Sequence, residues 1–202
     1  MKLYYKPGAC SLSPHIVLRE AGLPFELDRV DTKSGKTQSG GDFASINPKG
    51  YVPSLQLDDG QVLTEGAVIV QYLADRKPEM KLAPASGTME RYRLQEWLNF
   101  IATEIHKSFS PLFNRKAPDE VRQAQLDRLG ARLDYLAKQL EKRPFLMGNT
   151  FSVADAYLFT ILKWAKVVNL DLARWPSLTA FQDRVGSRPA VRAAMEAEGL
   201  LS

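Results

Sequence analysis

The spacing of apolar residues changes partway along the chain. In the first 75 residues, short stretches of apolar positions that tend to alternate with polar ones are separated by stretches with a helical period. The predicted strands cover residues 2–5, 25–31, 52–57 and 61–64, and the predicted helices cover residues 11–21 and 67–74. A strand-helix-strand unit predicts a parallel pair with a right-handed crossover. The turn at residues 58–60 (Asp-Asp-Gly) predicts a hairpin that adds antiparallel strands to the same sheet.

Prolines and little periodicity mark residues 77–87 as a linker. After it the pattern is helical throughout, with helices predicted at residues 90–109, 119–141, 152–168, 177–185 and 190–197. Ser152 and Asp155 match a capping box with Asp in place of Glu. The pattern therefore predicts an α/β domain over residues 1–80, followed by an all-helical domain over residues 87–202.

Composition excludes several classes of protein. Apolar residues make up 45% and charged residues 25%, which are values typical of a globular chain rather than a disordered one. The single cysteine, Cys10, cannot form an intramolecular disulfide, and with two histidines it supplies too few ligands for a zinc finger. No metal site is expected.

Charge and targeting signals lead to similar exclusions. The net charge of +4 is not gathered into a basic block, so no nucleic-acid partner is expected. No apolar run approaches the ~20 residues of a membrane span, so no membrane association is expected. No signal peptide precedes the first strand. We therefore expect a cytoplasmic protein whose cysteine is reduced.

Cys10 is the first candidate for chemistry. It follows the first strand and lies where the first helix begins, with Ser11 and Ser13 after it. Free N–H groups and the helix dipole favour a thiolate at such a position. The alternative is a small buried residue, which is what most free cysteines are.

The Val52-Pro53 bond is the second candidate. In a chain with a thiol and this strand order, a proline opening a strand predicts a cis bond. We expect it to leave the Val52 N–H and C=O groups unpaired and facing the Cys10 loop, where an extended peptide could pair with them.

Two further positions suggest ligand binding. Glu65 and Gly66 lie between a strand and a helix, where free N–H groups suit a carboxylate and Glu65 suits an ammonium. An acid there is also a common helix-stabilising residue. His106 lies seven residues after Asn99, so an α-helix places both on one face. Tyr157 and Trp164 are interpreted as core aromatic residues.

Several motifs together resemble the bacterial beta-class glutathione transferases. The resemblance runs from Met1 to about residue 200, and within the class it is nearest to the transferases of biphenyl and polychlorobiphenyl degradation. The motifs that carry it are MKLYYKPGACS (1–11), NPKGYVP (47–53), LTEG (63–66), EWLNFI (96–101), EIHK (104–107) and FSVADAYL (151–158).

The resemblance implies a fold and a site. The fold is a thioredoxin-like N-terminal domain (β-α-β-α-β-β-α) and an all-helical C-terminal domain, assembled as a homodimer. Glutathione is the cosubstrate, with no other cofactor, and Cys10 and His106 are the implied catalytic residues. The implied glutathione contacts are Cys10, Lys36, Tyr51, Val52, Pro53, Glu65, Gly66, Asn99, Thr103, Glu104 and His106. Thr103 and Glu104 are expected to act across the dimer interface.

Two departures from the family pattern stand out. Gly35 occupies the position of the lysine that often binds the glycine carboxylate, and we expect Lys36 to replace it. Gly66 replaces the serine of some members, which leaves only its backbone N–H. A small hydrophobic electrophile is the expected second substrate, in a pocket walled by Phe109, Phe113 and Trp164.

The predicted activity is conjugation of the glutathione thiolate to hydrophobic electrophiles, including dehalogenation of chlorinated aromatic-pathway metabolites. Two alternatives remain open. One is a glutathione-dependent thiol-disulfide reductase that uses Cys10. The other is a non-catalytic carrier of hydrophobic ligands.

Overall fold

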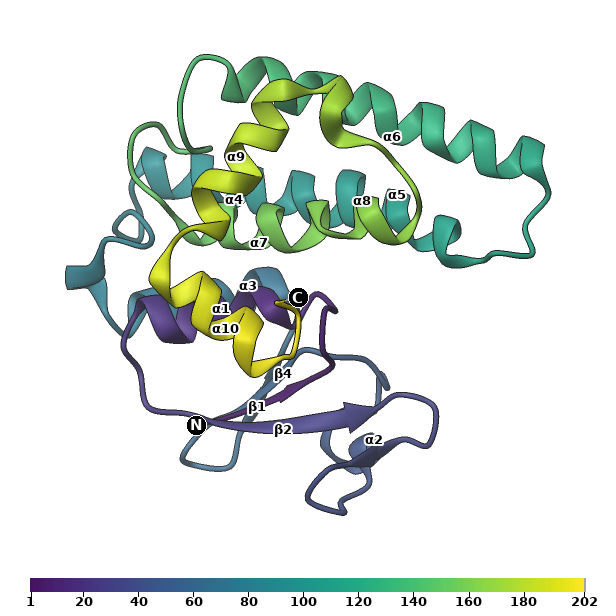
Figure 1. Ribbon diagram of the computed structural model, residues 1–202. Helices are drawn as coiled ribbons and strands as arrows, with labels where there is room; N and C mark the ends of the chain where they lie inside the picture. The colour runs from purple at the N-terminus through teal and green to yellow at the C-terminus, as the bar shows by residue number, and fades with distance from the viewer. Residues whose placement is uncertain (202) are drawn as a thin grey trace. The chain divides into compact units, whose positions relative to one another are not determined.

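The computed structural model describes residues 1–201, which form two compact units (Figure 1). The first unit contains residues 1–83 together with residues 187–201, and the second contains residues 84–186. The predicted helical domain over 87–202 therefore differs from the structure at its end. Its last helix packs with the first unit.

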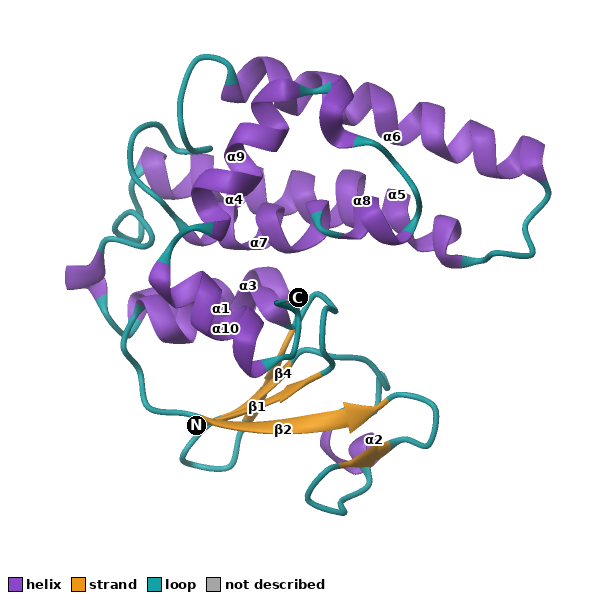
Figure 2. Ribbon diagram, in the orientation of Figure 1, coloured by secondary structure: helices purple, strands orange, loops and turns teal. Residues whose placement is uncertain are grey.

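A five-stranded mixed sheet forms one layer of the first unit (Figure 2). Its strands are β1 (Lys2–Tyr5), β2 (Glu26–Asp31), β3 (Lys36–Thr37), β4 (Ser54–Gln56) and β5 (Val62–Thr64), in the order β3-β2-β1-β4-β5. The pair β1 and β2 is parallel, and β4 is antiparallel to both β1 and β5. This is the predicted arrangement. The short strand β3 was not predicted, because the Lys-, Ser- and Gly-rich sequence around it has no alternating pattern.

Helices α1 (Leu12–Glu20) and α3 (Gly66–Asp75) bury the apolar faces that the sequence pattern predicts. Helix α10 (Pro189–Ala197) packs beside α1, as Figure 1 shows. Its residues Val191 and Ala194 have no exposed surface. Apolar burial therefore assigns the end of the chain to the first unit. The unit also contains α2 (Phe43–Ile46) and a 3-10 turn, η1 (Pro78–Met80).

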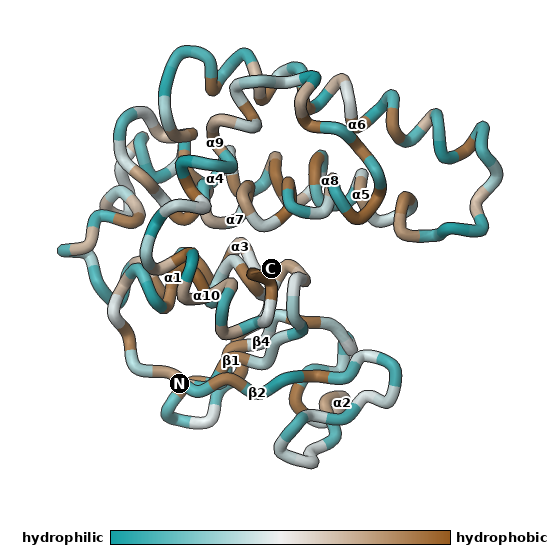
Figure 3. The backbone as a smooth tube through the Cα atoms, viewed as in Figure 1, coloured by the Kyte–Doolittle hydropathy of each residue, from teal (hydrophilic) through white to brown (hydrophobic). Residues whose placement is uncertain are grey.

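The second unit is entirely helical. Its elements are α4 (Met89–Phe100), η2 (Ile101–His106), α5 (Lys107–Phe109), η3 (Ser110–Phe113), α6 (Asp119–Leu140), α7 (Val153–Leu162), α8 (Trp164–Val167), η4 (Leu172–Arg174) and α9 (Pro176–Gly186). All ten residues of α7 are buried, and its trace is largely apolar in Figure 3. A helix buried on every side forms the centre of such a bundle. None of the helices described over residues 1–201 is long and apolar enough to cross a membrane.

Together the two units have the predicted fold class, an α/β domain joined to helical structure. Two predicted helices differ in detail. The helix predicted over 90–109 changes its hydrogen-bond pattern at Ile101, where η2 is a π-helix. The helix predicted over 152–168 is divided between α7 and α8 at Lys163.

The predicted capping box begins α7. The Asp155 carboxylate accepts hydrogen bonds from the Ser152 N–H and hydroxyl, each at 2.8 Å. It also accepts the Leu146 N–H at 2.8 Å, and Asp155 has no exposed surface. This carboxylate therefore fixes both the start of α7 and the segment before it.

We expect Asp155→Ala to lower the free energy of unfolding by about 3 kcal/mol or more. Three buried donors lose their acceptor, and each unpaired buried group costs roughly 1–3 kcal/mol. Thr88→Ala is the matched control, since the Thr88 hydroxyl caps α4 by accepting the Arg91 N–H and also donates to the Ala85 carbonyl at an exposed position. Losing such a cap costs about 0.5–2 kcal/mol. Urea unfolding of both variants measures the difference. Equal losses would show that Asp155 is an ordinary cap.

Candidate functional site

The Cys10 thiol lies against the backbone of Val52. The cysteine occupies a turn just before α1, and its Sγ donates a hydrogen bond to the Val52 carbonyl at 3.3 Å. The Val52-Pro53 bond is cis, as predicted. The sequence predicts an unpaired Val52 carbonyl. In the structure this carbonyl is paired, because it accepts the hydrogen bond from the Cys10 thiol. The Val52 N–H has no acceptor among residues 1–201, so it remains able to pair with a ligand.

The start of α3 lies beside this turn. A Cβ added to Gly66 would be 3.6 Å from the Pro53 Cγ, so the helix start and the cis proline are adjacent. The same distance leaves room for a side chain, so packing alone does not require glycine here. The first N–H groups of a helix have no partner within it, and those of Gly66 and Ala67 point out of the helix start. They are the anion-binding groups that the sequence predicts.

Glu65 precedes this helix in a strained conformation. Its φ is 70° and its ψ is 109°, values that a non-glycine residue rarely adopts. Such strain costs on the order of 1–3 kcal/mol and is typical of binding sites. The conformation places a carboxylate next to free N–H groups, which gives one turn both an acid and an anion-binding surface.

Two neighbours satisfy the Glu65 carboxylate. Its Oε1 accepts hydrogen bonds from the Lys49 Nζ at 2.6 Å and from the Tyr51 hydroxyl at 3.1 Å. The hydrogen bonds to Glu65 raise the pKa of both Lys49 and Tyr51. Sequence reasoning did not select Lys49, since only the fold brings residue 49 to residue 65.

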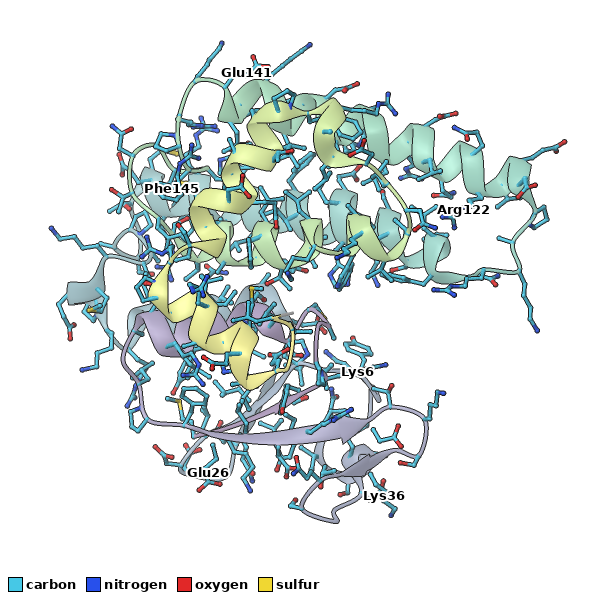
Figure 4. The ribbon with its side chains drawn as sticks, viewed as in Figure 1. Lys6, Glu26, Lys36, Arg122, Glu141 and Phe145 are labelled. Carbon is cyan, nitrogen blue, oxygen red and sulfur yellow. The ribbon has the colours of Figure 1, made fainter. Side chains whose placement is uncertain are left out.

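Lys36 lies in β3 with an exposed side chain, and Figure 4 labels it in the first unit. Its amine has no acceptor among residues 1–201. Lys6, by contrast, is already engaged, because its Nζ donates to the Thr32 hydroxyl at 2.9 Å. The role of Lys36 as a carboxylate ligand stays a prediction.

A buried carboxylate from the end of the chain holds the Cys10 loop. Glu198 caps α10, and its Oε2 accepts the Gly8 N–H at 2.9 Å. Its Oε1 lies 2.9 Å from the His15 Nδ1, and the Arg19 Nε donates to the His15 Nε2 at 3.0 Å. Since Nε2 accepts, Nδ1 carries the ring proton and donates to Glu198. Neither the Glu198 nor the His15 side chain is exposed.

Sequence reasoning missed both residues. In the sequence, His15 is only one of two histidines that are too few for a zinc site. Glu198 follows a predicted helix, and no nearby residue in the sequence indicates its partner. No local signal marks them, because they lie 183 positions apart.

In the second unit, His106 sits among aromatic rings. Its Nδ1 lies 2.7 Å from the Tyr157 hydroxyl, and its ring packs edge-on at 4.8 Å from that of Trp164. Burial, with a smaller effect of Lys107, lowers the pKa of His106 to about 4. The imidazole is therefore neutral at neutral pH. Tyr157 and Trp164 are buried, as their core interpretation requires.

The π-helical segment changes the relation of His106 to Asn99. Residues 101–106 follow an i→i+5 pattern, which has more residues per turn than an α-helix. The α-helical spacing used to predict a shared face therefore does not apply here, and a shared face for Asn99 and His106 stays a prediction. Asn99 and Thr103 are exposed, and Glu104 pairs with the Arg132 Nε at 2.8 Å.

The predicted electrophile-pocket residues form one aromatic group. Trp164 contacts Phe109 at 6.0 Å and Phe113 at 5.3 Å between ring centroids. Phe113 is 43% exposed, whereas Phe109 has no exposed surface. Phe109 therefore acts on a pocket only by supporting Trp164. Over residues 1–201, no three His, Cys, Asp or Glu side chains are placed to hold a metal ion.

A thiol next to a cis proline, and an acid beside free N–H groups, define a thioredoxin-like thiol site attached to a helical domain. Comparison with known proteins gives its family. Residues 8–76 match "Glutathione S-transferase, N-terminal domain", and residues 100–189 match "Glutathione S-transferase, C-terminal domain".

Relatives that match over the whole chain belong to the same family. The chain is 47% identical to "Glutathione S-transferase GstA" of Escherichia coli O157:H7, over 99% of this chain and all of the relative. Among solved structures it is similar to "Ternary complex of BphK, a bacterial GST" (62% identity, TM-score 0.97, covering 99% and 100%). It is also similar to a beta-class enzyme of Sphingomonas chungbukensis (46% identity, TM-score 0.96, full coverage of both). The chain belongs to the glutathione S-transferase family, and the predicted beta-class resemblance is confirmed.

We expect Glu198→Gln to lower the free energy of unfolding by about 1–3 kcal/mol, since one buried donor then faces an amide N–H instead of an oxygen. Amide hydrogen exchange at Gly8 should become at least tenfold faster. Glu196→Gln, on the exposed face of α10, is the matched control and should change stability by less than about 0.5 kcal/mol. Unchanged exchange at Gly8 would show that Glu198 does not hold the loop.

We expect the His106 ring to titrate in NMR spectra with a midpoint near 4, because burial disfavours its charged form. The folded state then binds fewer protons than the unfolded state between about pH 4 and 6.5. This group's contribution to stability is therefore lost as the pH falls through that window. With two histidines in the chain, His106→Gln assigns the signal. A midpoint at or above 6 would contradict the assignment.

Proposed function

We propose that the chain conjugates glutathione to small hydrophobic electrophiles, and that the first unit binds glutathione along the Cys10–Val52–Glu65 surface. The observation that carries this proposal is the arrangement of the Cys10 thiol, the free Val52 N–H and the N-terminus of α3. An extended peptide with a sulfur near its middle and an α-amino acid at one end matches these groups in kind. Glutathione has this chemistry. No further cofactor is proposed.

Each group has a separate task in this proposal. The Val52 N–H pairs with the cysteinyl backbone of glutathione, in the manner of an added strand. The N–H groups of Gly66 and Ala67 bind the γ-glutamyl carboxylate, and Glu65 binds the α-ammonium. Lys36 is the proposed partner of the glycine carboxylate.

The sulfur chemistry balances without another reactant. The glutathione thiol releases a proton to solvent, and its thiolate attacks the electrophilic carbon. With an aryl chloride, a C–S bond forms, the C–Cl bond breaks, and chloride leaves with the electron pair. The chain holds the thiolate among donors and places the carbon beside it.

His106 acts in its neutral form in this proposal. If the Tyr157 hydroxyl donates to Nδ1, the ring proton is on Nε2, which then serves as a hydrogen-bond donor. Asn99, Phe113 and Trp164 are proposed to contact the electrophile. Thr103 and Glu104 are proposed to act on glutathione of a partner subunit in a homodimer.

Chlorinated aromatic metabolites are the proposed electrophiles, on the basis of the resemblance to transferases of biphenyl degradation. Turnover of a panel of such compounds, with chloride release measured, tests this. Conjugation without any chloride release from the panel would exclude dehalogenation and leave the transferase activity intact.

Thiol-disulfide reduction is the second candidate, and it is favoured because Cys10 is a free cysteine that is only partly buried. Cys10 attacks oxidised glutathione, forms a mixed disulfide and releases one glutathione thiolate. The test assays conjugation of 1-chloro-2,4-dinitrobenzene and reduction of a mixed disulfide side by side, in wild type and Cys10→Ser. Conjugation that survives the substitution while reduction is lost assigns the thiol to the second activity. Loss of neither activity would remove Cys10 from both mechanisms.

A hydrophobic-ligand carrier is the remaining alternative from the sequence. Tight binding of an apolar dye with neither activity would favour it. Membership of an enzyme family and the retained thiol argue against it.

We expect Glu65→Gln to weaken glutathione binding about tenfold. A charge-assisted hydrogen bond is worth roughly 1.5–3 kcal/mol, and ~1.4 kcal/mol is tenfold. The low end applies because the Glu65 side chain is 51% exposed and already paired with Lys49. Calorimetry should also use a glutathione analogue without the α-amino group, and its affinity should change less than twofold. Equal losses for both ligands would show that Glu65 does not bind the ammonium.

A further inference from the structure

An ammonium group of the chain itself lies on the carboxylate of Glu65. The Lys49 Nζ is 2.6 Å from the Glu65 Oε1, and it donates a second hydrogen bond to the Thr64 hydroxyl at 3.1 Å. The distance to Glu65 is that of a short, charge-assisted hydrogen bond. The α-ammonium of glutathione, which is proposed to bind Glu65, is the same chemical group. Lys49 therefore stands where that group of the ligand would bind.

The Glu65 Oε1 cannot take both ammonium groups together. It accepts the Lys49 Nζ and also the Tyr51 hydroxyl at 3.1 Å, and a carboxylate oxygen has two lone-pair sites. Two cations beside one carboxylate also repel each other, because they share a single negative charge. A ligand ammonium that binds this oxygen must therefore displace the lysine.

The environment of Lys49 allows it to leave. Its side chain is 47% exposed and that of Glu65 is 51% exposed, so water reaches the ion pair. Exposed ion pairs of this kind contribute little free energy. The lysine stem is flexible, and its ammonium is strongly hydrated once it turns to solvent. Displacement of Lys49 therefore lowers the affinity for the ligand by a small factor and does not block the site.

We propose that Lys49 competes with the α-ammonium of glutathione for the Glu65 carboxylate and leaves it when glutathione binds. This inference rests on the proposed role of Glu65 in glutathione binding. In the unliganded chain, Lys49 keeps this carboxylate paired at its strained turn. A ligand without the amino group leaves Lys49 in place. Lys49 thereby sets how strongly the site prefers glutathione over peptides that lack the α-amino group.

The test measures the affinities of glutathione and of its analogue without the amino group, glutaryl-cysteinyl-glycine, by calorimetry on the full chain. The readout is the ratio of the two affinities. We expect Lys49→Met to raise the preference for glutathione about threefold, because its ammonium no longer has to displace a cation, and an exposed ion pair is worth a factor of about two to five. Lys49→Arg keeps a cation at Glu65 and should leave the ratio as in the wild type.

Two controls separate competition from a long-range effect of charge, since the analogue carries one more net negative charge than glutathione. Lys77→Met is the matched control, because Lys77 is also a half-exposed lysine of the first unit, with its Nζ 3.5 Å from the Glu79 carboxylate. It should leave the ratio unchanged. In the Glu65→Gln background, Lys49→Met should also leave the ratio unchanged, because no carboxylate is then left to compete for.

Two results would overturn the proposal and leave the role of Glu65 intact. The first is an unchanged ratio in Lys49→Met while Glu65→Gln still weakens glutathione selectively. Equal weakening of both ligands in Lys49→Met would be such a case, and it would make Lys49 a ligand for a carboxylate. The second is the same rise in the Glu65→Gln background, which would assign the rise to long-range charge. Equal losses of both ligands in Glu65→Gln alone would instead contradict the proposed role of Glu65, and this inference with it.

Discussion

The position of the Cys10 thiol depends on one buried carboxylate. Glu198 has no exposed side-chain surface, so its oxygens must be hydrogen-bonded within the protein. They accept hydrogen bonds from the N–H of Gly8, in the loop before Cys10, and from the ring N–H of His15, in the helix after it. The last helix must therefore lie against α1. The fork between Arg188 and Glu20, at 2.6 and 2.8 Å, holds the start of α10 to the end of α1.

Local structural rules are broken where the chemistry is expected. Glu65 adopts a positive φ that favours glycine, and Glu198 places a negative charge at the C-terminus of a helix, against the helix dipole. A π-helical segment that ends at His106 lies between α4 and α5. Each exception costs stability at its own position. Sites of function are where such conflicts are expected.

The sequence predicted those structural features that depend on residues close together in the chain. Periodicity predicted β1, α1 and the β4–β5 hairpin, and the Ser152–Asp155 capping box lies within four residues. Long-range pairs could not be predicted in this way. Nothing near Glu198 indicates His15 or Gly8, and the pairing of Lys49 with Glu65 depends on how a loop returns to the sheet. The π-helical segment was also missed, because the apolar pattern of residues 101–106 fits an α-helix equally well.

In the proposed complex, the Val52 backbone and the start of α3 form one glutathione-binding surface beside Cys10. Titration of the ¹⁵N-labelled chain with reduced glutathione, followed by NMR, tests this surface. We expect the amide signals of Val52, Gly66 and Ala67 to shift together and to saturate with a single dissociation constant. Saturable glutathione binding that leaves these three amides unshifted would show that glutathione binds elsewhere.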